Sequence, residues 1–142
     1  MKKILLFSVL FSGVLFFYSC KNDDDSNVDY EYHAHVHSPN TDNKYLGDTL
    51  NLDIAFESHS GLTVHHVNVR IYRKSDKVVI YSMPVDENIN ATSGTFEWND
   101  TFVLSVENGV TANTDLVLEA KVWGEKEGEG EEIETVQFHV QP

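Results

Sequence analysis

From Tyr30 onward, apolar residues recur at every second position, and no segment shows the spacing of an amphipathic helix. Alternation of this kind is typical of strands that bury one face and expose the other. The apolar positions of this chain fall in seven segments, at residues 30–36, 50–56, 67–71, 78–81, 96–104, 116–122 and 133–140. The pattern therefore predicts an all-β domain of about seven strands.

Turn-forming residues separate these segments. Residues 74–77 predict a hairpin turn, and residues 99–100 predict a bulge within a strand. Residues 125–132 are rich in glutamate and glycine, and they predict a loop between the last two strands because the glycines disfavour a helix. Strands at this spacing are typical of a single antiparallel immunoglobulin-like or fibronectin-type sandwich. A closed barrel is the second choice.

Residues 1–19 have the pattern of an export signal. Lys2 and Lys3 precede a largely apolar stretch that ends at Ser19, and charged residues follow Cys20. The stretch is short for a membrane-spanning helix, so we expect a lipoprotein signal peptide, with a retained anchor helix as the alternative. Cys20 is the only cysteine and has no disulfide partner, so we expect it to be lipidated.

Residues 20–29 are expected to comprise the lipidated cysteine and an acidic tether, because no apolar residue occurs between Cys20 and Val28. Acyl chains on Cys20 would bind the protein to a lipid bilayer. Lys21 and the acidic run directly after Cys20 resemble the signal of lipoproteins delivered to the outer face of the outer membrane, so we expect an outer-membrane, lipid-anchored protein. Its β-sandwich domain, residues 30–142, would lie either at the cell surface or facing the periplasm.

The charge of the chain excludes one class of partner. Eight of the ten basic residues and all 23 acidic residues lie from Cys20 onward, which gives this part a formal charge of −15 with neutral histidines. Such a charge repels nucleic acid and anionic lipid and attracts cations. We therefore expect no nucleic-acid partner.

Three of the seven histidines stand at alternate positions of the first predicted strand. Side chains two positions apart share a face and start about 7 Å from one another, so His33, His35 and His37 form a row. Neutral imidazole is a preferred ligand of Zn²⁺ and Cu²⁺, so we interpret this row as a candidate metal site. We expect His139 to join it, because the first and last strands of immunoglobulin-like folds run parallel and would end at the same pole.

A second candidate metal cluster consists of His59, His65 and His66, which flank residues 60–64. Sandwich topology would place this loop beside the glutamate-rich loop, whose carboxylates could complete a site. His65 and His66 are consecutive, so at most one of them shares a face with other ligands. Two alternatives remain for the histidines: ordinary strand residues without a ligand, or a pH-sensing patch.

Four segments carry a resemblance to known proteins: YEYHAH at 30–35, VHHVNVR at 64–70, LEAKVW at 118–123 and FHVQP at 138–142. With them the chain resembles a family of small histidine-rich bacterial lipoproteins of unknown function. The resemblance implies an immunoglobulin-like domain and no particular activity. A second histidine is usual in this family where Gln141 stands, which implies one candidate ligand fewer in this chain.

No enzyme motif occurs in the sequence, neither Gly-X-Ser-X-Gly nor His-Glu-X-X-His, and we expect no catalytic activity. Two functions remain. The first is a lipoprotein that takes up or buffers Zn²⁺ or Cu²⁺, since the absence of thiolate ligands argues against Cu⁺. The second is a non-metal binding or adhesion module that presents loops to a protein or glycan. It would use Tyr72, Tyr81 and Trp123, which the alternation places on outward positions.

Overall fold

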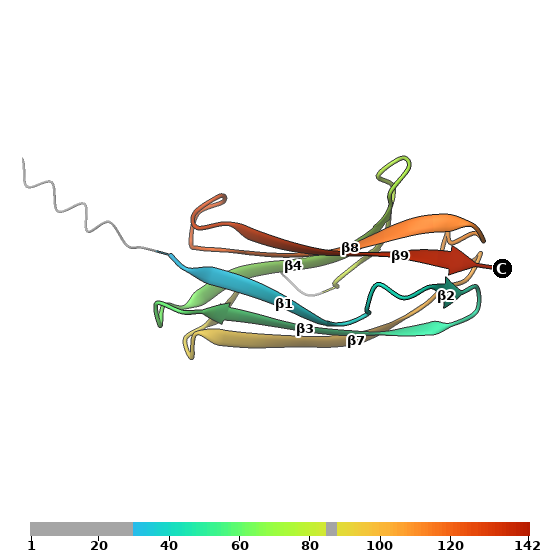
Figure 1. Ribbon diagram of the computed structural model, residues 1–142. Coiled ribbons are helices and arrows are strands. Elements are labelled where there is room, and N and C mark those ends of the chain that lie inside the picture. Colours follow the sequence, from blue (N-terminus) through green and yellow to red (C-terminus); the bar gives the residue numbers. More distant parts are fainter. Residues whose placement is uncertain (1–29, 85–87) are drawn as a thin grey trace, which may run out of the picture.

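The computed structural model describes residues 30–84 and 88–142 (Figure 1). The predicted signal peptide, Cys20 and the tether lie outside these residues. Within the described ranges, no helix is long and apolar enough to cross a membrane. The same ranges contain nine strands: β1 (Tyr32–Ser38), β2 (Lys44–Tyr45), β3 (Thr49–Ser58), β4 (Val64–Arg73), β5 (Val79–Ser82), β6 (Asn88–Ala91), β7 (Thr95–Val103), β8 (Thr114–Trp123) and β9 (Glu132–Gln141).

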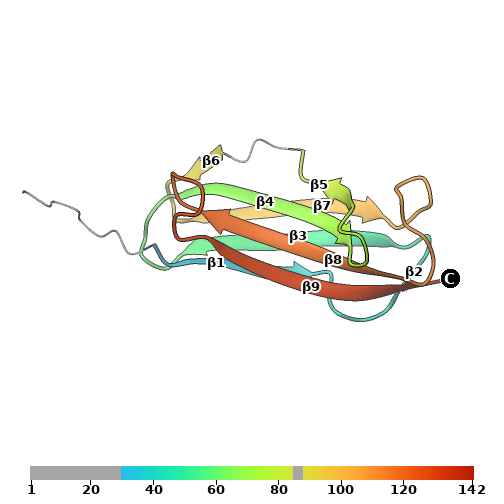
Figure 2. The same cartoon turned by 90° about the horizontal axis from the view of Figure 1, so that it is seen from above.

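The strands form two sheets that face each other, as Figures 1 and 2 show. The three-stranded sheet has the order β1-β3-β7. The six-stranded sheet has the order β2-β9-β8-β4-β5, with β6 paired to β4 outside this path. The strand pairs are antiparallel except for β2 with β9. This arrangement confirms the predicted all-β sandwich.

Two details differ from the predicted elements. The bulge expected at residues 99–100 is absent from the pairing with β3, because β7 matches β3 residue by residue from Thr95 to Val103. The short strands β2 and β6 were not predicted. They have two and four residues, too few for an alternating pattern to stand out.

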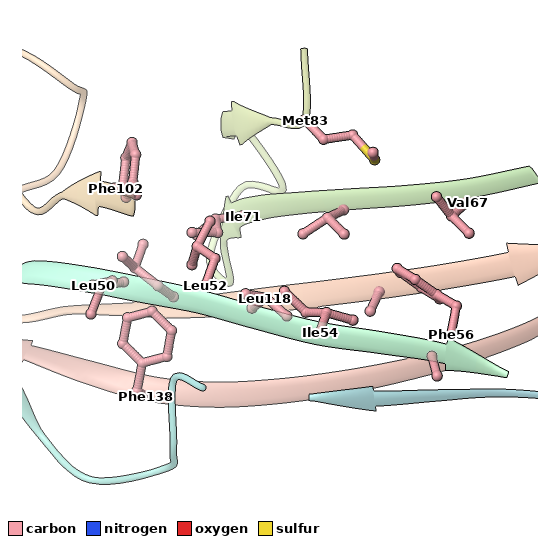
Figure 3. Packing of buried hydrophobic residues seen from close by; sticks show 14 of the residues in the cluster. Leu50, Leu52, Ile54, Phe56, Val67, Ile71, Met83, Phe102, Leu118 and Phe138 are labelled. Carbon is pink, nitrogen blue, oxygen red and sulfur yellow. The ribbon is translucent and has the colours of Figure 1, made fainter. Parts of the chain in front are cut away.

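The alternating apolar residues meet between the two sheets (Figure 3). Ile54 and Phe56 on β3 and Val67 and Ile71 on β4 belong to one buried cluster, and each is 0% exposed. Burial of a side chain of this size contributes about 1.5–3 kcal/mol to folding. No polar or charged residue is buried among those that the structure describes. The histidines and carboxylates therefore lie on the outer faces and edges of the sandwich.

Candidate metal site

The pairing of β1 with β3 brings imidazole and carboxylate side chains together. His33 lies opposite Glu57 in this antiparallel register. The ladder continues beyond the strands, because the backbone N–H of His59 donates to the carbonyl oxygen of Glu31 at 2.9 Å. Residues two apart share a face, and cross-strand neighbours on that face are in reach of one another. We call the resulting set the β1–β3 patch: Glu31, His33, His35, Glu57 and His59.

Two groups of potential ligands occur in the patch. In each group, one ligand atom from every member lies within 4.8 Å of the others. The first group is Glu31, His33 and His59, and the second is His35, Glu57 and His59. Each group offers two imidazoles and one carboxylate, a donor set that suits Zn²⁺ and other divalent transition ions. His59 belongs to both groups.

The distances within the patch leave its nitrogen atoms available. The rings of His33 and His59 lie 4.3 Å apart between centroids, at 41° to one another. Glu57 Oε2 lies 3.6 Å from His59 Nε2 and 3.9 Å from His35 Nε2. Both separations are longer than a hydrogen bond. The carboxylate and the two imidazoles thus point toward a common region without bonding to one another.

His33 is the most deeply placed imidazole of the patch. Its Nδ1 lies 3.3 Å from Glu132 Oε1, at the start of β9. Its Nε2 is buried and has no hydrogen-bond partner, and Glu31 Oε1 is 3.9 Å away. A metal-bound histidine commonly presents one nitrogen to the ion and donates its other N–H to a carboxylate. His33 is arranged in this way, with Glu132 as the carboxylate.

A glycine positions Glu132 beside His33. Gly130 has φ +58°, and a Cβ atom at this position would overlap the side chain of Tyr30. The loop before β9 can therefore pack closely on the residue that precedes β1, as only glycine permits here. This packing brings the start of β9 next to the start of β1. The carboxylate of Glu132 can then reach across from the other sheet.

The patch is open to solvent on one side. The side chain of His33 is 30% exposed, whereas His35, Glu57 and His59 are 45%, 42% and 49% exposed. An ion bound there would have coordination positions left for water or another ligand. Structural zinc sites, in contrast, are closed by four protein ligands.

The structure does not bring His37 into either group. The sequence places His37 in the row with His33 and His35, but the register of β1 against β3 shifts between Val36 and Ser38. One additional residue in β1 produces this shift, which is a β-bulge. His37 therefore has no cross-strand partner in the register of β3 and is not aligned with the polar face that carries Glu57.

His139 also lies apart from the patch. Its Nδ1 is hydrogen-bonded to Asp115 Oδ1 at 2.7 Å, on the neighbouring strand β8. The expected meeting with His35 and His37 does not occur, because β9 extends beyond β1 and pairs with β2 near its end. The described structure thus separates the histidines of the first and last strands.

The predicted cluster of His59, His65 and His66 is split between the sheets. The chain crosses from the three-stranded to the six-stranded sheet between β3 and β4, so His59 stays with the β1–β3 patch. His65 Nδ1 is hydrogen-bonded to Asn90 Oδ1 at 2.9 Å. The ring of His66 stacks on Trp123, with centroids 5.2 Å apart and planes at 11°. His65 and His66 each have a separate partner.

Two carboxylates of the site, those of Glu31 and Glu57, were not predicted as ligands from the sequence. Glu31 stands two positions before His33, and Glu57 two positions before His59. Alternation therefore places each glutamate on the same face as a histidine, which is the signal that could have identified them. Glu132 belongs to the glutamate-rich segment 125–132, whose carboxylates were expected to complete the second candidate cluster. The structure places Glu132 beside His33 instead.

Two aromatic side chains that were expected to be exposed, as a glycan- or protein-binding module would need, are instead covered by neighbouring residues. Trp123 is only 6% exposed, with the ring of His66 on one side and Lys121 Nζ 4.8 Å from its centroid. Tyr81 packs against Phe102, and its hydroxyl donates to Asp100 at 2.7 Å. The alternation predicted outward, exposed side chains at Tyr81 and Trp123, and neither is freely exposed.

Comparisons with solved structures identify the fold as immunoglobulin-like. A CARDB domain from Pyrococcus furiosus, determined by NMR, is similar with a TM-score of 0.51 and 12% identity, over 79% of this chain and 95% of that chain. A crystal structure of the Pyrococcus domain in complex with di-metal ions has a TM-score of 0.46 and 11% identity, over 80% and 96% of the two chains. A β-glucosidase from Listeria innocua in complex with glucose has a TM-score of 0.47 and 10% identity, over 80% of this chain and 16% of that chain.

The likeness to the NMR structure of the CARDB domain shows the architecture alone, because the identity is only 12%. No protein-family model matches the chain, and a comparison with curated proteins finds no match. The resemblance to histidine-rich lipoproteins therefore stays a prediction. The predicted immunoglobulin-like sandwich is confirmed.

Proposed function

We propose that this protein is a lipid-anchored lipoprotein that binds a divalent transition metal ion, Zn²⁺ or Cu²⁺, at the β1–β3 patch. The observation that carries metal binding is the buried Nε2 of His33, which has no hydrogen-bond partner while Nδ1 faces Glu132. A buried polar atom left without a partner costs about 1–3 kcal/mol. An ion bound to Nε2 would remove this cost, and Glu132 would hold the ring in the orientation that binding requires.

The donor atoms favour borderline divalent ions. Imidazole nitrogens and carboxylate oxygens suit Zn²⁺ and Cu²⁺, whereas Cu⁺ prefers thiolate and thioether sulfur. The described residues contain no cysteine, and Met83 is only 5% exposed within the core. The formal charge of −15 from Cys20 onward raises the local concentration of cations around the domain. The second candidate function, a protein- or glycan-binding module, has no comparable support.

Exposure of the patch supports uptake or buffering of an ion rather than a structural role. His35, Glu57 and His59 are 42–49% exposed, so an ion there would exchange with solvent. The core cluster consists of apolar side chains and contains no metal-ligating residue of the patch. We also propose no catalytic activity, since no catalytic motif accompanies the patch.

The lipid anchor at Cys20 and the outer-membrane location are supported by the sequence pattern. Tyr30 follows Cys20 by ten residue steps, which span at most about 35 Å when extended. Glu31 and His33 follow Tyr30 directly. An acylated Cys20 would therefore keep the patch within reach of the membrane surface.

Thermal unfolding and calorimetric titration test the proposal. Zn²⁺ at 100 times Kd stabilises a folded state that binds it by about 2.7 kcal/mol, so the Tm of the wild-type protein should rise. His33→Ala should abolish most of this rise. The matched control His65→Ala removes an imidazole outside the patch and should keep it. No metal-dependent shift and no binding heat in the wild-type protein would overturn the proposal.

A further inference from the structure

The β1–β3 patch offers two separate ligand groups rather than one. His33 and His35 never occur in the same group, and their ring centroids lie 6.1 Å apart. Two ligand atoms on one Zn²⁺ ion cannot be more than about 4.4 Å apart, since each lies 2.0–2.2 Å from the metal. Among the described residues, no set of three potential ligands this close together contains both His33 and His35. A single ion at His33 would therefore leave His35 and Glu57 without a metal.

His59 lies between the two groups. Its ring is 4.3 Å from that of His33, and its Nε2 is 3.6 Å from Glu57 Oε2 in the other group. Imidazole has two ring nitrogens, and each can coordinate an ion when neither carries a proton. We propose that the patch binds two divalent transition ions and that His59 bridges them. In this arrangement His59 Nε2 coordinates the ion beside Glu57, and His59 Nδ1 coordinates the ion beside His33.

The two-ion site rests on the metal binding proposed above, and its charges balance. Two divalent ions bring four positive charges. Glu31, Glu57 and Glu132 supply three negative charges, and the bridging imidazolate of His59 supplies the fourth. The ring N–H proton of His59 leaves to solvent as the second ion enters, so each nitrogen donates one lone pair to one metal. Repulsion between the two ions is thereby offset within the patch.

The two groups differ at one nitrogen atom, which sets the order of binding. Their other side chains are all partly exposed, and Glu31 of the first group is 62% exposed. The first group contains the buried Nε2 of His33, and Glu132 orients the same ring. The second group, formed by His35, Glu57 and His59, is 42–49% exposed and has no orienting carboxylate from the other sheet among the described contacts. The first ion therefore binds tightly beside His33, and the second binds more weakly beside His35.

Native mass spectrometry and calorimetry with Zn²⁺ test this arrangement. The wild-type protein should bind two ions per chain in a tight step and a weaker one. His35→Ala should lose the weaker step alone, whereas His33→Ala should lose the tight one. His59→Ala should weaken both steps at least tenfold, and the control His65→Ala should bind two ions like the wild-type protein. His59→Gln, which keeps a polar side chain, repeats the test if His59→Ala does not fold.

Electron paramagnetic resonance of the Cu²⁺ protein provides a readout of the bridge itself. The first equivalent should give the signal of an isolated ion, and the second should reduce the intensity per ion, because copper ions joined by one imidazolate couple magnetically. Binding of one ion per chain overturns the two-ion site and leaves the proposed metal binding intact. Two uncoupled ions, or two ions unaffected by His59→Ala, overturn the bridge. Binding of no ion overturns both proposals.

Discussion

The rings of His33 and His59 lie 4.3 Å apart, although one residue stands on β1 and the other follows the end of β3. Backbone pairing explains this contact. Tyr32 lies opposite Ser58, and the next step of the ladder joins Glu31 to His59. The two imidazoles are diagonal neighbours on one face of the sheet, a separation that long side chains can close. The candidate site is therefore a patch across two strands.

Glu132→Gln tests whether the carboxylate on β9 orients His33. Loss of a carboxylate that supports a metal-bound histidine typically weakens metal affinity about 10- to 100-fold. We expect Zn²⁺ titration calorimetry to show a decrease of this size in the tight step. Glu127→Gln, in the acidic loop that precedes β9, is the matched control and should bind Zn²⁺ like the wild-type protein. An unchanged affinity in Glu132→Gln would exclude the orienting role.

Removal of metal should leave the fold intact. The core cluster consists of apolar side chains from both sheets, and the patch lies outside it. We therefore expect excess EDTA to leave the far-ultraviolet circular dichroism spectrum unchanged, with cooperative thermal unfolding at the Tm of the metal-free protein. Proteins that depend on a structural metal unfold under the same treatment. Unfolding in EDTA would show that the metal is structural.

Phe56→Ala should be strongly destabilising. Phe56 is 0% exposed, and its ring centroid lies 6.4 Å from that of Phe96. Replacement of a buried phenylalanine by alanine typically costs about 3–5 kcal/mol, because it removes apolar burial and leaves a cavity. Urea unfolding at neutral pH measures the change. Val103→Ala, at a position 42% exposed, is the control and should change stability by much less. A loss in Phe56→Ala as small as that of the control would contradict the assigned core.

Alkaline pH should destabilise the protein through Tyr32. Burial, together with the nearby Tyr30 and Glu129, raises the pKa of Tyr32 from 10.0 to about 12. Between these values the unfolded chain loses the phenolic proton while the folded protein keeps it, so the free energy of unfolding falls as pH rises. This contribution is complete below pH 10 and is lost toward pH 12.

Urea unfolding of the wild-type protein and Tyr32→Phe at pH 8 and pH 11 measures this effect. The side chain at position 32 of the variant cannot ionise, so the variant should lose less stability between the two pH values. It also lacks the hydroxyl that donates to the Thr63 carbonyl oxygen at 2.8 Å, so it should be less stable than the wild-type protein at pH 8. Equal pH dependence in the two proteins would exclude Tyr32 as a contributor.

Much of the fold could be predicted from the sequence, because burial of one face leaves a period of two in every long strand. Leu50, Leu52 and Ile54 are all buried, as their alternation predicts. The exposure of Trp123 was predicted incorrectly. An outward side chain on a sheet can still be covered by its cross-strand neighbours, here His66 and Lys121.

The candidate site could be predicted only in part. Alternation within one strand shows that His33 and His35 share a face, and the structure places both in the patch. It does not give the register between strands, which tertiary packing decides. For this reason the sequence assigned His59 to a different cluster. It also linked the glutamate-rich segment 125–132 to that cluster, whereas Glu132 of this segment lies beside His33.

Nitrogen chemical shifts of the histidine rings test the central claim most directly, because they report each imidazole separately. We expect Zn²⁺ added to the ¹⁵N-labelled protein to shift the ring nitrogens of His33, His35 and His59. The ring nitrogens of His65, His66 and His139 should stay unchanged. Shifts confined to the latter three histidines, or no shifts at all, would contradict a metal site at the β1–β3 patch.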